Sequence, residues 1–150
     1  MKRPRHATRI TRVFLVEDEP LVRRGLRVLF SLEPDLEVCG EAESEREALD
    51  GILTQQPDLT VVDLNLKQGT GLALITQLRQ QLPTLRILVF SMHSEVEMVR
   101  LAFAAGAAGY VLKEEGTDQV LDAIRQVVQG RRYLSTHLAA KYRVSCRAAV

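Results

Sequence analysis

Short apolar runs alternate with longer segments of helical spacing along most of the chain. Four runs of apolar or β-branched residues end abruptly in polar residues, at positions 13–16, 59–62, 87–90 and 110–112. Such runs, bounded by turn residues, indicate strands buried on both faces. A fifth run, residues 36–42, partly alternates and is typical of a strand with one more exposed face. The sequence therefore predicts five strands.

Between these runs, apolar residues recur three and four positions apart, which is the spacing of one helix face. Pro20 suits the first turn of a helix after the first strand. Ser44 with Glu47 is a capping box for a helix over 45–55, and Ser94 with Glu97 predicts another box. A helix is expected after every strand, and Gly130 ends the last one.

Five βα units in strict alternation predict a parallel sheet with helices on both faces and right-handed crossovers. The expected organisation is one domain over residues 9–133, preceded by a basic N-terminal extension over 1–8. After Leu134 the sequence shows no strand and only weak periodicity. We interpret residues 134–150 as a tail or the start of a linker.

Charge is distributed unevenly along the 150 residues. Residues 1–12 and 125–150 carry five and six Lys or Arg and no acid, which leaves nine basic against all 19 acidic residues in 13–124. An acidic body does not resemble a nucleic-acid surface, and it suits cation binding. The two cysteines have no metal-type spacing, no run is long enough to span a membrane, and no secretory signal is evident. We expect a cytoplasmic location without a membrane.

Polar side chains follow four of the predicted strands. Glu17 and Asp18 follow the first, and the other three are followed in turn by Asp63, Ser91 and Lys113. The carboxyl ends of parallel strands share one edge of a sheet, so these groups should meet. Clustered carboxylates need a cation, and a set of oxygen ligands alone favours Mg²⁺. A carboxylate can also accept a phosphoryl group, and a lysine and a hydroxyl suit the phosphate oxygens.

This constellation resembles the receiver domain of bacterial two-component response regulators, over about residues 9–133. The wording EDEPLVRRGL and AGAAGYVLK is similar to the NarL/FixJ-type subfamily, whose receivers usually precede a helix-turn-helix domain. The resemblance implies a flavodoxin-like (βα)5 doubly wound sheet with strand order 2-1-3-4-5. Residues at the family positions are the acidic pair Glu17 and Asp18, the phosphoacceptor Asp63, the switch residues Ser91 and Tyr110, Lys113, and Gly71 eight positions past Asp63.

The resemblance implies a mechanism and partners as well. A sensor histidine kinase would donate a phosphoryl group to Asp63, with Mg²⁺ held by Asp18, Asp63 and the backbone carbonyl of Asn65, and with Glu17 acting through water. Ser91 and Tyr110 would then repack the face formed by the fourth helix, fifth strand and fifth helix. A phosphorylation-linked homodimer is expected, with DNA contacted only through an output domain that nothing after residue 134 resembles. Such a protein is not an enzyme beyond its own phosphorylation and dephosphorylation.

Other readings compete with this one. A haloacid-dehalogenase-like phosphatase needs a second aspartate where this chain has Asn65, and a nucleotide-binding domain needs a glycine loop after the first strand. A receiver-shaped interaction module that works without phosphorylation stays open. Taken alone, Tyr110 is a half-buried strand aromatic and His93 a loop residue beside the site. Lys67 replaces the usual proline four positions past the phosphoacceptor, and we expect a less rigid loop there.

Overall fold

One parallel sheet organises the chain. The computed structural model describes residues 9–148, with side chains up to residue 143. Neighbouring strands are parallel throughout, in the order β2-β1-β3-β4-β5-β6. The strands are β1 (Thr11–Val16), β2 (Leu36–Ala42), β3 (Leu59–Val62), β4 (Arg86–Ser91), β5 (Gly109–Leu112) and β6 (Tyr133–Leu134). The predicted flavodoxin-like order 2-1-3-4-5 is confirmed for the first five.

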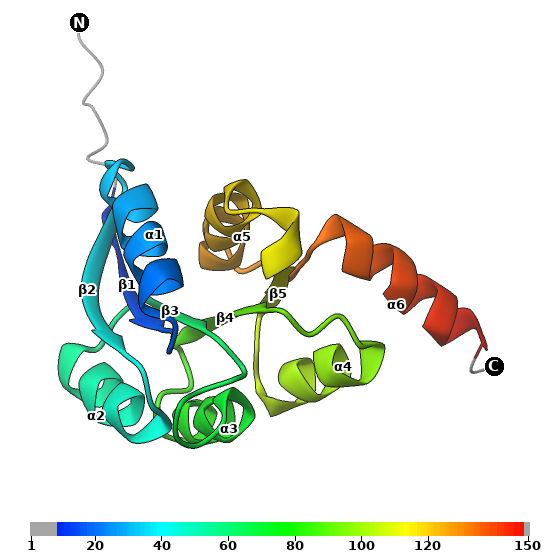
Figure 1. Cartoon of the computed structure of the whole chain (residues 1–150), viewed down its shortest axis with the longest axis horizontal. Coiled ribbons are helices and arrows are strands. Elements are labelled where there is room, and N and C mark those ends of the chain that lie inside the picture. Colours follow the sequence, from blue (N-terminus) through cyan, green and yellow to red (C-terminus); the bar gives the residue numbers. More distant parts are fainter. Residues whose placement is uncertain (1–8, 149–150) are drawn as a thin grey trace, which may run out of the picture.

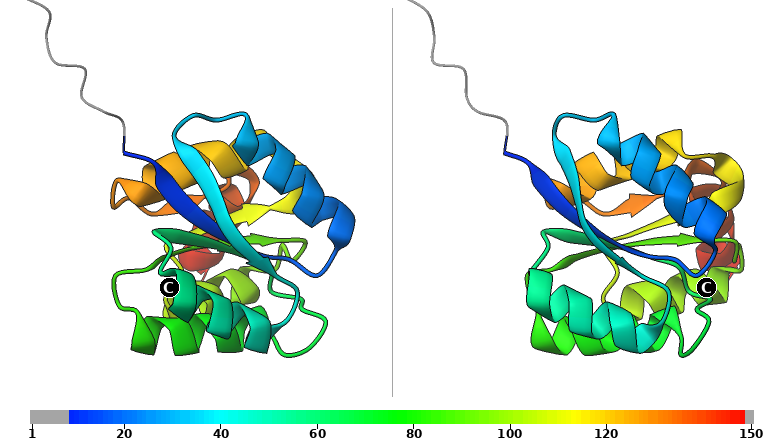
Figure 2. Two further views of the ribbon diagram at one scale, coloured as in Figure 1. Left: turned by 90° about the vertical axis from the view of Figure 1, so that its left-hand side faces the viewer. Right: turned by 60° about the vertical axis from the view of Figure 1, so that its left-hand side comes forward.

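Helices cover both faces of this sheet, as the alternating pattern predicts. They are α1 (Pro20–Ser31), α2 (Glu45–Gln55), α3 (Gly71–Gln81), α4 (Val96–Ala105), α5 (Asp118–Val128) and α6 (Thr136–Ala148), with a 3₁₀ turn η1 (Lys113–Glu115) after β5. Figures 1 and 2 show α1 and α5 on one face, and α2, α3 and α4 on the other. No helix in the described part of the chain is long and apolar enough to cross a membrane.

The strand β1 shows why the apolar runs are uninterrupted. Val13 and Leu15 pack on the side of α1 and α5, whereas Phe14 and Val16 pack on the side of α2, α3 and α4. All four side chains are at most 3% exposed. Alternate residues of a strand point to opposite faces, so a strand covered on both faces favours apolar residues at every position. Burial of each side chain contributes about 1.5–3 kcal/mol, which fixes the register.

The C-terminal segment differs from the prediction. Residues 133–134 form a sixth strand beside β5, and residues 136–148 form a helix, in the segment for which the sequence predicts a tail or the start of a linker. Leu138 is 1% exposed and joins the core on the α4 side. A two-residue strand is too short to show a period, and few residues of α6 pack on the domain, which explains the weak signal. The predicted basic extension over 1–8 lies outside the described residues.

Helix starts were predicted with mixed success. The Ser44 hydroxyl accepts a hydrogen bond from the Glu47 amide at 3.3 Å, as the capping box predicts. The box predicted at Ser94 is wrong, because α4 begins at Val96, and Glu95 stands at the N-cap without a side-chain cap. The preceding loop is held instead by His93, whose contacts belong to the site described next.

Candidate functional site

The predicted polar groups meet at the carboxyl edge of the sheet. Glu17 and Asp18 directly follow β1, and Asp63 directly follows β3. The Asp63 amide donates to the Val16 carbonyl at 2.9 Å, which continues the β1–β3 pairing past the end of both strands. Ser91 is the last residue of β4, and Lys113 is the first residue after β5. Separate βα units therefore deliver every predicted group to one place.

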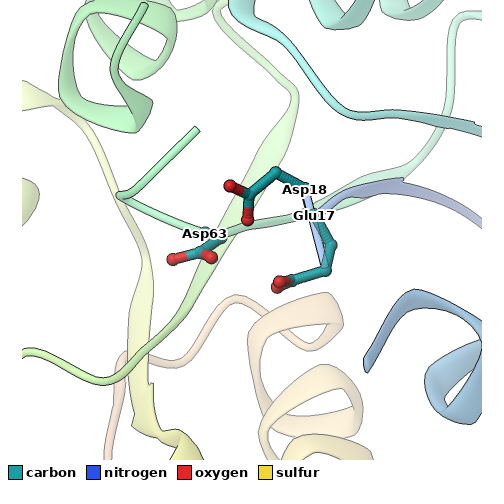
Figure 3. Close-up of side chains that lie close together, drawn as sticks. All are labelled: Glu17, Asp18 and Asp63. Carbon is teal, nitrogen blue, oxygen red and sulfur yellow. The ribbon is translucent and has the colours of Figure 1, made fainter. Parts of the chain in front are cut away.

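Three carboxylates form the acidic part of this site. Glu17, Asp18 and Asp63 each offer one oxygen, and these oxygens lie within 4.8 Å of one another (Figure 3). Glu17 is 2% and Asp63 4% exposed. Burial, followed by the nearby Asp63 charge, raises the pKa of Glu17 to about 7. Three oxygen donors without His or Cys fit Mg²⁺, which neutralises clustered carboxylates.

Lys113 supplies the positive charge at this site. Its Nζ atom lies 3.0 Å from Glu17 Oε1 and 3.0 Å from Asp63 Oδ2. Burial opposes the charged ammonium, but hydrogen bonds to Glu17 and Asp63 outweigh it, and the pKa of Lys113 is raised. The lysine side chain is 9% exposed. A cation between two buried carboxylates is stabilised by both, and removal of the lysine would leave two buried carboxylates without their cation.

Both oxygens of Asp63 have defined partners. Oδ1 accepts a hydrogen bond from the backbone N–H of Asn65 at 3.1 Å, and Oδ2 accepts a hydrogen bond from Lys113 Nζ at 3.0 Å. The carboxylate orientation is therefore fixed by the turn that follows β3 and by a lysine 50 residues away. The side-chain oxygen of Asn65 also lies 3.0 Å from Nε2 of His93, which joins this turn to the β4–α4 loop.

Gly71 packs directly against the backbone of Asp63 and Leu64. Its amide donates to the Leu64 carbonyl at 3.0 Å. A Cβ atom at this position would lie 2.4 Å from the Asp63 carbonyl oxygen and 2.7 Å from Leu64 Cα. Both neighbours are backbone atoms, which cannot rotate away. The glycine eight residues past Asp63 is therefore required by close packing of α3 on the turn.

A brace on this turn could not be predicted from the sequence. Glu45, the first residue of α2, accepts hydrogen bonds from the Thr70 amide at 3.0 Å and from the Gln77 side chain at 3.2 Å. Its partners are 25 and 32 residues away, so no local pattern marks it. Lys67, which replaces the usual proline, lies 3.9 Å from Glu43. The first residue of α2 and the loop before this helix thus both contact the segment that follows β3.

The predicted switch residues are linked through His93. The His93 amide donates to Ser91 Oγ at 3.2 Å, and the Tyr110 hydroxyl donates to the His93 carbonyl at 2.7 Å. Tyr110 is fully buried, in contrast to the half-buried position that the sequence suggests. Burial raises the pKa of Tyr110 to about 12. The ring therefore fills the interior beneath the β4–α4 loop and holds that loop by its backbone.

This arrangement has the groups that a phosphoryl acceptor needs. Asp63 is an oriented carboxylate nucleophile, and Lys113 places a positive charge beside its oxygen. The Ser91 hydroxyl stands at the next strand end, and the three carboxylates can hold a divalent cation. No histidine or cysteine lies among the groups that the structure assigns to this candidate cation site.

Comparisons with known proteins agree with this geometry. A model of the response regulator receiver domain matches residues 13–125. The chain is 36% identical over 140 residues to the DNA-binding transcriptional activator DevR/DosR of Mycobacterium tuberculosis, covering 93% of this chain and 64% of that protein. It is 35% identical over 136 residues to the nitrate/nitrite response regulator protein NarL of Escherichia coli K12, covering 91% and 63%.

Solved structures give the same answer. A LuxR-family two-component response regulator from Aurantimonas superposes with a TM-score of 0.87 at 34% identity, covering 91% of this chain and 97% of that one. The isolated receiver of RcsB from Salmonella enterica, at 21% identity and a TM-score of 0.81, shares the fold and covers 87% and 97%. The chain spans just under two thirds of the length of the curated relatives named above. The protein belongs to the response regulator receiver domain family, and its relatives are NarL- and LuxR-type regulators.

Proposed function

We propose that the protein is a signalling phosphoacceptor, which takes a phosphoryl group from a sensor histidine kinase onto Asp63. One observation carries this proposal above the others. Lys113 Nζ lies 3.0 Å from Asp63 Oδ2, although the two residues come from different strands and are 50 positions apart. A largely buried lysine beside a strand-end aspartate is not needed for folding alone, because replacement of such a pair by apolar residues is often neutral or stabilising.

Glu17, Asp18, Asp63 and the backbone carbonyl of Asn65 would hold Mg²⁺. The three carboxylate oxygens within 4.8 Å of one another support this assignment. The ion would supply positive charge to the oxygens of the transferred group. Glu17 is one methylene longer than the aspartate usual at this position, and it already contacts Lys113, which favours a role through water.

The residues of this chain then have separate parts in the transfer. An oxygen of Asp63 forms the new bond to phosphorus, the bond from phosphorus to the kinase histidine nitrogen breaks, and that histidine takes up a proton. The backbone N–H of Asn65 keeps the Asp63 carboxylate oriented through its hydrogen bond to Oδ1. The Lys113 ammonium can stabilise the negative charge on the oxygens of the transferred phosphoryl group, and the Ser91 hydroxyl can donate a hydrogen bond to one of these oxygens. Hydrolysis of the acyl phosphate resets the site.

The output follows from the contacts of Ser91 and Tyr110. His93 joins the two residues, since its amide binds Ser91 Oγ and its carbonyl binds the Tyr110 hydroxyl. Movement of Ser91 toward a phosphate would therefore move the β4–α4 loop and Tyr110 together. We propose that this repacks the surface of α4, β5 and α5, which would support a phosphorylation-linked homodimer. Control of transcription in the cytoplasm, with DNA contacted through an output domain, completes the proposal.

Beryllofluoride, an analogue of the bound phosphoryl group, tests this function without a kinase. We expect the protein to bind it only with Mg²⁺, observed as a protein-bound ¹⁹F signal with chemical-shift changes at Asp63 and Ser91. Asp63→Asn should abolish the signal, because the carboxylate oxygen is lost. Asp50→Asn, on the exposed surface of α2, is the matched control and should bind as the parent does. Failure of the folded parent protein to bind would refute the phosphoacceptor assignment.

A further inference from the structure

We propose that α6 is an internal partner of the α4–β5 surface, docked while Asp63 is unmodified and released when Asp63 carries a phosphoryl group. This inference rests on the proposed function and adds to it a segment of the chain that sequence patterns did not mark as structured. Its basis is a pair of tethers that join the start of α6 to residues beside the site.

Helix α6 lies alongside α4 at the far edge of the sheet (Figure 1). It packs through Leu138, which is buried, and Tyr142, which is partly buried one turn later. Arg100 of α4 stacks over the Tyr142 ring, with its guanidinium carbon 5.9 Å from the ring centre. Most other side chains described on α6 face solvent. Such a small apolar contact suits a helix that binds the domain reversibly.

The first tether runs from Tyr110 to the start of α6. Strand β6 pairs with β5, with Tyr110 opposite Leu134. The Ser135 amide then donates to the Tyr110 carbonyl at 3.1 Å, and α6 begins at the next residue. The backbone of the proposed switch residue is therefore hydrogen-bonded to the residue that precedes the helix. A shift of the Tyr110 backbone would strain or break this contact.

The second tether runs from the turn that contains Lys113. This turn, η1, spans three residues and ends at Glu115. Glu115 Oε1 accepts a hydrogen bond from the His137 amide at 2.8 Å, in the first turn of α6. Amides in the first turn of a helix have no partner within the helix, and a carboxylate there also favours the helix dipole. Glu115 thus caps α6 from a position two residues after Lys113.

Docking also has a cost at this junction. Within the part of the chain that the structure describes, Ser135 Oγ and Glu115 Oε2 are buried without a hydrogen-bond partner. Buried polar atoms without partners oppose the conformation that buries them. The two tethers and the Leu138 contact therefore favour docking of α6, whereas burial of these two unpaired oxygens at the same junction opposes it. Loss of either tether should shift the balance toward release.

Phosphorylation would act on both tethers. A phosphoryl group adds charge and acceptor oxygens at Asp63, which draws Lys113 away from its present position between Glu17 and Asp63. Because Lys113 and Glu115 belong to the same three-residue turn, a movement of Lys113 would also move Glu115. A movement of the Tyr110 backbone would reach Ser135 through their hydrogen bond. By linkage, anything that releases α6 must also favour binding of the phosphoryl group or its analogue.

Hydrogen exchange followed by mass spectrometry tests the proposal on the whole chain. Beryllofluoride with Mg²⁺ should speed amide exchange in peptides over 136–143, while peptides of α2 stay unchanged. Glu115→Ala should speed α6 exchange by up to about fivefold without any ligand, which is the factor expected for loss of a helix-capping acceptor, reduced by removal of the unpaired Oε2. It should also tighten beryllofluoride binding by up to the same factor. Glu114→Ala, in the same turn and exposed, is the matched control and should change neither.

Leu138→Ala is the second variant, because it weakens docking without touching the turn. It should reproduce both effects of Glu115→Ala. If beryllofluoride binds, as its ¹⁹F signal reports, and α6 exchange is unchanged or slower, the inference is wrong while the proposed function stands. Equal exchange in Glu115→Ala and Glu114→Ala would also overturn it. If beryllofluoride does not bind at all, the proposed function and this inference both fail.

Discussion

Replacement of Gly71 by alanine should test how α3 is packed against the site. The added Cβ would lie 2.4 Å from the Asp63 carbonyl oxygen, whereas ordinary contact begins at 3.4 Å. The backbone of Asp63 or the start of α3 must therefore move by about 1 Å. Overpacking of this kind costs about 1–3 kcal/mol. Alanine is favoured over glycine by up to about 1 kcal/mol only within a helix, and Gly71 is the first residue of α3, so we expect a net loss of up to about 3 kcal/mol.

The same substitution should also impair function. A displacement of about 1 Å at a reacting group can reduce a rate by about a hundredfold. We expect Gly71→Ala to remain folded and to be phosphorylated by acetyl phosphate more slowly than the parent, by up to that factor. Urea unfolding gives the first quantity, and the initial rate of mass gain gives the second.

Gly25 provides the matched control. It lies within α1, and a Cβ built there meets nothing within 4 Å. Gly25→Ala should therefore raise the free energy of unfolding by about 0.5–1 kcal/mol and leave phosphorylation unchanged. The packing argument is refuted if Gly71→Ala is stabilised as Gly25→Ala is and is phosphorylated at the parent rate.

Three further predictions concern charge. Lys113→Gln, with metal chelated, should lower the free energy of unfolding at neutral pH by about 3 kcal/mol, since two buried carboxylates lose their cation; a smaller loss at pH 5 is expected, and an unchanged urea midpoint would contradict it. Tyr110, whose pKa burial raises to about 12, should stabilise the fold fully below pH 10 and less as pH rises from 10 to 12; Tyr110→Phe should remove that late step from the absorbance titration. The hydrogen bond from Arg125 lowers the pKa of Asp35, so this pair should stabilise the fold above pH 4 and less as pH falls further; the pair is partly exposed, so Arg125→Gln should cost at most about 1 kcal/mol at pH 7 and less at pH 3.

The sheet and the site could be predicted because their signals are long or repeated. Five buried runs that alternate with helical segments predict a parallel sheet, whereas the strand order came from the resemblance to a family. The strands of a parallel sheet bring their carboxyl ends to one edge, and at that edge Lys113 Nζ lies 3.0 Å from Asp63 Oδ2. The assignment of roles to Ser91 and Tyr110 depended on resemblance to a family. No spacing in this sequence would have supplied it.

What the sequence did not predict depends on contacts between distant residues. Strand β6 has two residues, and it exists because β5 offers it an open edge. Glu45 braces the turn after β3 through partners on α3 and in the preceding loop. The capping box expected at Ser94 is absent because the loop before α4 follows the hydrogen bonds of His93 with Asn65 and Tyr110. Local sequence patterns do not show which of several possible hydrogen-bond partners a residue takes in the folded chain.

Phosphorylation by acetyl phosphate, read by intact-protein mass spectrometry at neutral pH, tests the central claim most directly. The account predicts one added phosphoryl group in the presence of Mg²⁺ and none when the metal is chelated. Peptide mapping after hydroxylamine treatment should place it at Asp63, and Asp63→Asn should gain no mass. A folded parent chain that gains no phosphoryl group, or that carries it on another residue, would contradict the account.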